Sequence, residues 1–317
     1  CQIPITFCVL RHLQVLYLDA NLLSGTLNVC WNRTQYISAS LNQLSSINIT
    51  SHYHRNRLEY VNVSHNDIHQ SYDSVSSLLS FPVFDTLDIS NNYVTGRLSY
   101  HRIADARNVS RLAVIDVSDN CMSTDIDGSV CQLMRLRSFL ASTMYNTFKC
   151  PGRSWYRMSI ARHAYPSCVL QLPNISTVNL IGNAMTGSLV DIDVASSQLS
   201  FVGLISNRLT GTLPMSWQRY GRFDQLLLSF NKLSGALRSD FAVNESMTSL
   251  EMSINRLSGA LPSSFGSVRS GIDVIEGNVI SCASQSIYDK ADDTNKSTYE
   301  CGSLSLDVVG YVSCVCV

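Results

Sequence analysis

A segment of about 24 residues recurs along this chain, and this repetition restricts the fold more than any other feature of the sequence. Three copies begin at Leu199, Phe223 and Met247 and share the pattern L-x-x-L-x-L-x-x-N-x-L-[ST]-G-x-L. Earlier copies begin at Leu13, Leu58, Phe84, Leu112 and Ile175, and a degenerate copy ends at Asn278. One copy cannot bury its own apolar side, so we expect the copies to stack into a solenoid with one continuous core.

Each part of the pattern predicts a local structure. The L-x-L alternation is typical of a short, half-buried strand, and strands stacked about 4.8 Å apart would form a parallel sheet on the concave face. The Asn follows the strand, where its amide can both donate to and accept from buried backbone groups at the turn. It recurs as Asn21, Asn66, Asn92, Asn120, Asn183, Asn207, Asn231 and Asn255. The predicted fold class is a curved repeat solenoid of the α/β class, mostly β.

These motifs resemble leucine-rich repeat proteins of the 24-residue type found in plant receptor ectodomains, whose pattern includes L-S-G-x-[IL]-P. Residues 210–217 and 258–265 resemble more narrowly the repeats of kinetoplastid protist surface antigens, which read S-G-T-L-P-x-x-W. The general resemblance covers about residues 13–262 apart from an insertion, and it implies a leucine-rich repeat solenoid. Most copies lack the final proline, and the stretch between Leu27 and Leu58 is irregular.

The repeat spacing also predicts the organisation of the chain. Residues 1–12 are expected to be an N-terminal cap, in which Cys1 and Cys8 resemble the cysteine pair of the plant-type cap. Residues 13–262 form the solenoid. The long interval between Asn120 and Asn183 leaves room for one extra coil near residues 133–140 and an insertion at about 141–172. Residues 263–317 are expected to hold a last degenerate repeat, with a strand in 272–280, and then a C-terminal cap and tail.

Cysteines and glycosylation sequons favour an extracellular or cell-surface location. The chain has 11 cysteines without the paired CxxC of a zinc site, so disulfides are the better interpretation. A disulfide between Cys150 and Cys168 would close about 19 residues of the insertion, although the connectivity does not follow from the sequence. The disulfide candidates are Cys1, Cys8, Cys121, Cys131, Cys150, Cys168, Cys282 and Cys301. The sequons begin at Asn32, Asn48, Asn62, Asn108, Asn174, Asn244 and Asn295.

The strand positions that face water predict where a partner binds. They are polar and acidic in the N-terminal half of the solenoid and apolar in the C-terminal half, and an apolar patch on a protein surface favours an interface. The candidates there are Phe201, Ile205, Leu227, Phe230 and Ile254. The alternative is that these side chains only shield each other. Within the insertion, Trp155 and Tyr156 would contact a partner, or else pack on the flank of the solenoid.

Two sequons fall near expected strands. Asn62 lies between Val61 and Val63, so a glycan there would project from the sheet and favour binding at the other half. Asn48 is expected to do likewise.

No catalytic, metal or cofactor motif accompanies these features. His52, His54, His65 and His69 are separated by the repeat geometry, and no nucleophile elbow, phosphate-binding loop or zinc-protease motif is present. The net charge of -1 argues against nucleic acid as a partner. The longest apolar stretch near the end has 12 residues, whereas a membrane helix needs about 20, so an anchor would lie outside this sequence. We therefore expect a non-enzymatic recognition module that binds protein, peptide or glycan. The alternatives are a structural coat or adhesion protein and, more remotely, a hydrolase with its chemistry in the insertion.

Overall fold

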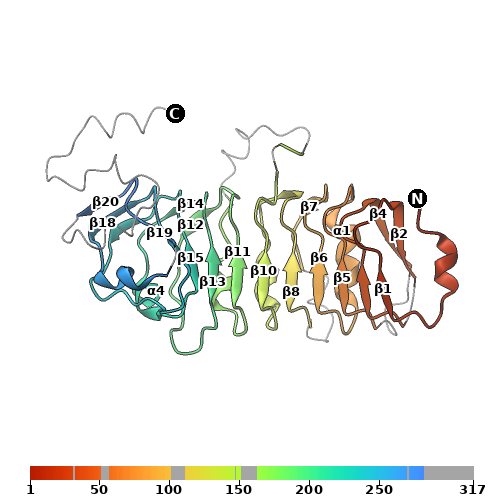
Figure 1. Cartoon of the computed structure of the whole chain (residues 1–317), viewed down its shortest axis with the longest axis horizontal. Coiled ribbons are helices and arrows are strands. Elements are labelled where there is room, and N and C mark those ends of the chain that lie inside the picture. Colours follow the sequence, from red (N-terminus) through yellow and green to blue (C-terminus); the bar gives the residue numbers. More distant parts are fainter. Residues whose placement is uncertain are drawn as a thin grey trace. The chain divides into compact units, whose positions relative to one another are not determined.

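The computed structural model describes residues 1–30, 33–50, 57–100, 111–146, 148–150, 163–269 and 271–281 (Figure 1). They belong to two compact units, which are residues 1–186 with 195–199, and residues 187–194 with 200 onward. In both units each repeat contributes one three-residue strand to a parallel sheet. The first unit holds β1 (Val15–Tyr17), β3 (Tyr36–Ser38), β5 (Tyr60–Asn62), β6 (Thr86–Asp88), β8 (Val114–Asp116), β10 (Ser138–Leu140) and β11 (Thr177–Asn179). The second holds β13 (Phe201–Gly203), β15 (Gln225–Leu227), β17 (Ser249–Glu251) and β19 (Gly271–Asp273).

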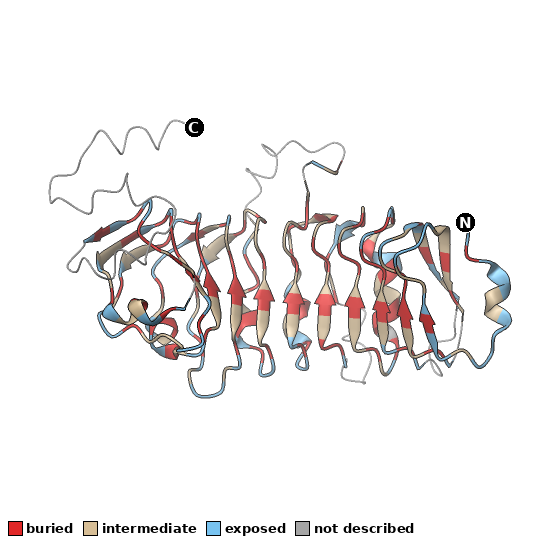
Figure 2. Ribbon diagram, viewed as in Figure 1, coloured by how far each residue is buried: buried red, intermediate tan, exposed pale blue. Residues whose placement is uncertain are grey.

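The strands bury the residues that the pattern predicts. The middle residue of each strand is buried in the core, and in most strands both neighbours are less buried, which Figure 2 shows as a buried centre between less buried ends. In β3, β13 and β15 the third residue is buried as well. Adjacent strands pair without slippage, so that Leu226 lies opposite Val202 and Leu250. Leu204, Leu228 and Met252 are buried as well, which confirms the register assigned to the late repeats.

The rest of each repeat returns on the other side of the core. The described short strands there are β2 (Ser24–Val29), β4 (Gln43–Ile49), β7 (Thr95–Arg97), β9 (Cys121–Ser123), β12 (Thr186–Ser188), β14 (Arg208–Thr210), β16 (Ser234–Ala236), β18 (Arg256–Ala260) and β20 (Val279–Ser281). The helical turns are η1 (Ile5–Val9), α1 (Tyr72–Val75), η3 (Ser76–Ser80), η4 (Gly128–Gln132), η5 (Ser167–Gln171), α4 (Met215–Tyr220) and η6 (Ser263–Ser267). Within the described ranges, none of these helices has the length and apolar character needed to cross a bilayer.

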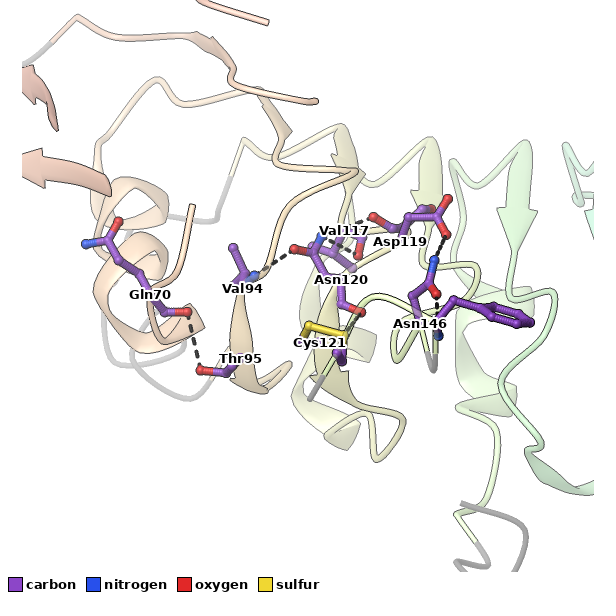
Figure 3. Close-up of a disulfide and its surroundings, with 11 residues drawn as sticks. Gln70, Val94, Thr95, Val117, Asp119, Asn120, Cys121 and Asn146 are labelled. Carbon is purple, nitrogen blue, oxygen red and sulfur yellow. Dashed lines mark hydrogen bonds between the residues drawn. A yellow bond between two sulfur atoms is a disulfide. The ribbon is translucent and has the colours of Figure 1, made fainter. Parts of the chain in front are cut away.

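A column of buried asparagines connects successive repeats, as the sequence predicts. Asn120 shows the arrangement (Figure 3): its Oδ1 accepts from the Val94 amide of the preceding repeat at 2.9 Å. Its Nδ2 donates to the carbonyl oxygens of Ile89, Val117 and Ser118 at 3.0–3.1 Å. One side chain therefore satisfies backbone groups of two coils, groups that would be costly to bury unpaired.

The residue before each column position has a left-handed backbone. It has a positive φ in all eleven described repeats, where a side chain normally costs about 1–2 kcal/mol. These residues are Ala20, Leu41, His65, Asn91, Asp119, Thr143, Gly182, Ser206, Phe230, Ile254 and Gly277.

One repeat was not recognised in the sequence. Asn42 belongs to the column, because its Oδ1 accepts from the Leu23 amide and its Nδ2 donates to the Leu18 carbonyl. The sheet strand of this repeat is β3, and Asn48 lies in β4, outside that sheet. The expectation that Asn48 projects from the sheet is therefore wrong: the alternation in residues 47–49 belongs to the returning side of the repeat.

The cysteine pairing differs from the expected pattern. Cys8 pairs with Cys30, which links η1 to the end of β2, and Cys1 is a free, exposed thiol. Cys150 does not pair with Cys168. Each cysteine of that pair instead bonds one from the preceding coil, giving Cys121–Cys150 and Cys131–Cys168. Cysteines of neighbouring coils are close in space although they are far apart in sequence. Cys282 and Cys301 lie outside the described residues.

Met144 takes the asparagine position in the repeat of β10. Its side chain cannot bond the preceding coil, and the Met122 amide donates instead to the Met144 carbonyl at 2.8 Å. The Cys121–Cys150 disulfide joins the same two coils, beside Asn146, whose Nδ2 donates to Asp119 at 3.3 Å (Figure 3). A covalent link therefore lies where the asparagine column is interrupted.

The expected extra coil near residues 133–140 is confirmed by β10, which pairs with β8 and β11. The last repeat contains two strands, β19 and β20, where a single strand in 272–280 was expected. Residues 147 and 151–162 of the expected insertion, and everything after Ser281, lie outside the described residues.

Candidate functional site

The outward side of the sheet is a surface that the repeats build from equivalent positions. It consists of the first and third residues of each strand, the second residue after the strand, and the left-handed residue before the column. We call this surface the sheet face. Its chemistry differs between the two units, which are described in turn.

In the second unit the sheet face carries exposed apolar side chains. Phe230 is 51% exposed and Ile254 is 36% exposed, and Phe201 and Ile205 are half-buried. We call these four residues the apolar patch. Leu227 was expected to face water, but it is only 9% exposed, so its side chain is largely covered. The accessible area of the patch therefore centres on Phe230 and Ile254.

Phe230 and Ile254 also have strained backbones. Their φ angles are 57° and 50°, a region that large and β-branched side chains rarely adopt. Gly277, the equivalent residue of the next repeat, has no such strain. A Cβ there would lie 2.8 Å from the Ile254 Cα, so this position accepts only glycine. Exposed apolar side chains at strained positions are unfavourable for folding, and such strain is often retained for function.

In the first unit the third strand position carries a row of hydrogen-bonded polar side chains. The Asn62 and Asp88 side chains each accept from the amide and hydroxyl of the serine two residues further on, at 2.7–2.9 Å. Asp116 accepts from the Ser118 amide at 2.9 Å. Each of these side chains therefore accepts hydrogen bonds from the residues that directly follow its own strand, and these bonds stabilise the turn at the end of that strand.

Asp116 has an unusual acidity. Its pKa is raised to about 6, chiefly by burial. The carboxylate of Asp88, directly opposite on β6, adds to the rise, and the hydrogen bonds from Ser118 partly oppose it. The ionised form is therefore less favourable in the folded chain than in the unfolded chain, where the pKa is 3.8. The resulting loss of stability is absent below pH 4, develops as the pH rises from about 4 to 6, and is complete above that.

We expect Asp116→Asn to stabilise the protein at neutral pH. The amide oxygen keeps the bond from the Ser118 amide, as Asn62 does with Ser64, and the charge is removed. The gain should be about 1 kcal/mol at pH 7.5, allowing for partial solvent screening. It should shrink toward zero at pH 4. Urea unfolding of both proteins across this range measures it, and a gain that does not change with pH would contradict the assignment to this carboxyl.

A groove of about 840 Å³ runs along the strand-start side of the sheet face in the first unit. Tyrosines from β1, β3 and β5 line one end, Glu59 and Asp85 line the middle, and Arg111, Arg135 and Arg137 line the other end. We call it the tyrosine–arginine groove. All three arginines are exposed, and none forms an ion pair with another described residue.

The tyrosines form a stack. The rings of Tyr36 and Tyr60 lie parallel at 4.0 Å between centroids, and Tyr17 is tilted against Tyr36 at 5.0 Å. Burial and then the neighbouring Tyr60 hydroxyl raise the pKa of Tyr36, so it stays neutral. The stack is a rigid platform with Tyr17 exposed at its end.

The sequence interpretation missed this groove. Tyr36 belongs to the unrecognised repeat, and the arginines lie one or three residues before the strands, outside the positions considered. The available signal was the recurrence of R-L before the strand, at Arg111-Leu112 and Arg135-Leu136.

Other expected sites are placed as follows. Within the described ranges no group of three or more metal-ligating side chains is close enough to hold a metal, and His69 stacks on Tyr93 at 4.3 Å. Asn48 and Asn174 are exposed, and Asn62 and Asn244 are half-buried. Asn174 lies at the arginine end of the tyrosine–arginine groove. Trp155, Tyr156, Asn32, Asn108 and Asn295 lie outside the described residues.

No protein-family model and no curated protein matches this sequence, but solved structures share its fold. The plant peptide hormone receptor RGFR1, in complex with RGF2, is 16% identical with a TM-score of 0.58, over 89% of this chain and 54% of that one. The Arabidopsis receptor kinase HAESA, in complex with the peptide hormone IDA and the co-receptor SERK1, is 17% identical with a TM-score of 0.59, over 88% and 52%. The Leptospira interrogans LRR protein LIC12759 is 19% identical with a TM-score of 0.59, over 92% and 73%.

These likenesses establish the fold as a leucine-rich repeat solenoid with a long parallel sheet, as predicted. The chain spans about half the length of the two plant receptor structures. The narrower resemblance to kinetoplastid surface antigens stays a prediction.

Proposed function

We propose that this chain is a non-enzymatic, extracellular recognition module that binds a protein or peptide through the sheet face. The observation that carries the proposal is that Phe230 and Ile254, at equivalent left-handed positions of adjacent repeats, both expose apolar side chains. Folding alone would favour Asn or Gly there, so a partner that covers both side chains accounts for their presence. The disulfides and the sequons support an extracellular location.

The similar folds support the proposal only by analogy. RGFR1 and HAESA were solved in complexes with peptide hormones, and this chain shares their solenoid architecture at low identity. A structural coat protein is the second candidate, favoured by the number of sequons and by the resemblance to protist surface antigens. A coat protein has no need of exposed apolar side chains at equivalent positions of adjacent repeats, so the patch distinguishes the two.

The test is the double variant Phe230→Asn, Ile254→Asn. Asn tolerates the left-handed backbone, so relief of strain offsets the lost apolar contact and stability should stay within about 1 kcal/mol of wild type. Short peptides selected from a random displayed library against the wild-type protein are then titrated against the variant by calorimetry. We expect most of them to bind the variant at least about tenfold more weakly.

Leu41→Asn is the matched control. Leu41 is 55% exposed and has the same backbone conformation, with φ 54°, but it lies in the first unit outside the patch. Its replacement should leave peptide affinity within about twofold. If the selected peptides bind the double variant as tightly as wild type, the apolar patch is not the binding site.

A further inference from the structure

The tyrosine–arginine groove has a charge pattern that the apolar patch does not explain. Three arginines without an ion-pair partner among the described residues lie close together, since β8 and β10 are adjacent strands. Like charges in neighbouring positions repel each other, and a bound anion would remove that repulsion. Glu59 and Asp85 immediately precede the adjacent strands β5 and β6, and both line this groove, so they form a pair of neighbouring acidic groups.

We propose that this groove binds an extended peptide segment with a basic side chain over Glu59 and Asp85 and an acidic side chain among the three arginines. This site is separate from the apolar patch. It would allow the protein to bind a second kind of ligand, a peptide that carries one positive and one negative side chain. The tyrosine stack would form the apolar floor beyond the basic side chain.

The strand spacing determines how far apart the two ligand charges must be. The acidic pair lies at β5 and β6 and the arginines at β8 and β10, so the two centres are two strand intervals apart, about 10 Å. In an extended polyproline-type chain, side chains three residues apart lie on one side at about 9 Å. The groove therefore fits a basic and an acidic residue at positions i and i+3.

A polyanion such as a sulfated glycan fits less well. It would satisfy the arginines, but its charges would continue over Glu59 and Asp85 and be repelled there. The dipolar peptide uses both charged sets, and charge complementarity of this kind determines specificity in protein recognition.

The test uses capped proline-rich peptides, whose termini carry no charge and whose backbone holds the spacing. The probe has one lysine and one glutamate three positions apart. Comparison peptides carry two glutamates, two lysines, or the lysine and glutamate six positions apart. Each is labelled with a fluorophore and titrated by anisotropy against the full, deglycosylated chain at low salt. We expect the i, i+3 probe to bind at least about tenfold more tightly than each comparison peptide.

Two variants and a control locate the binding. Arg111→Gln with Arg137→Gln should weaken binding of the probe about tenfold or more, whereas Arg269→Gln, an exposed arginine of the second unit, should not change it. Glu59→Lys with Asp85→Lys should reverse the preference toward the two-glutamate peptide. The patch variant Phe230→Asn, Ile254→Asn should bind the probe as tightly as wild type. A negative result for the proposed patch site can therefore be told apart from a negative result for the proposed groove site.

Three results would overturn the proposal. They are no binding of the i, i+3 probe at millimolar concentration, equal binding of all spacings, and tighter binding of a heparin-derived oligosaccharide that depends on the arginines but not on Glu59 and Asp85. The last result would assign the groove to anionic glycans.

Discussion

Replacing Asn231 by alanine is expected to lower the free energy of unfolding by about 3 kcal/mol, one of the two largest effects we predict. Its Oδ1 accepts from the Leu209 amide at 3.0 Å, and its Nδ2 donates to the carbonyls of Leu204, Leu228 and Ser229 at 2.9–3.3 Å. Alanine leaves the buried Leu209 amide without a partner, and water cannot reach it without opening the repeat. The carbonyls of Leu204, Leu228 and Ser229 each lose one donor and keep another, from Asn207, Asn255 and Ser206 respectively.

Two further variants test this explanation. Asn231→Asp retains the size and the acceptor but cannot donate, so it should also destabilise strongly at pH 7. Lys232→Ala changes the exposed neighbouring side chain and should shift stability by less than about 0.5 kcal/mol. Urea unfolding measures the loss, and hydrogen exchange at the Leu209 amide localises it. Similar losses at Asn231 and Lys232 would mean that the column is not the source of stability.

Removing the Cys121–Cys150 disulfide is expected to have an effect of similar size. The two cysteines are 29 residues apart, and the chain-entropy model gives roughly 3.5 kcal/mol for closing such a loop. The location adds to the effect. Met144 supplies no side-chain bond to the preceding coil, so this disulfide is the substitute link at the interruption of the asparagine column.

The reference protein is Cys1→Ser, which removes the free exposed thiol. The test protein carries Cys121→Ser and Cys150→Ser in that same Cys1→Ser background. The test protein should unfold at lower urea concentration, and its Met122 amide should exchange faster than amides two repeats away. If the test protein matches Cys1→Ser in stability, or if exchange increases equally in all repeats, the disulfide does not compensate for Met144.

The sequence by itself determined the repeat, the strand register and the role of the asparagines. These features are local: alternation decides which side of a strand is buried, and an Asn after the strand recurs because every coil has the same turn. Leu204, Leu228 and Met252 were therefore placed correctly without any structure. The repeat containing Asn42 was missed because Thr34 and Ala39 replace the first and third leucines of the pattern and Ser46 replaces its glycine.

Only the tertiary structure decided which side chains are covered and which distant residues meet. Leu227 occupies a strand position that the pattern predicts to face outward, but it is only 9% exposed. Cys150 bonds Cys121 and not Cys168, because bonding depends on the distance between coils. The tyrosine–arginine groove collects its side chains from successive coils. Periodicity gives the direction of a side chain, but exposure and proximity depend on residues a full repeat or more away.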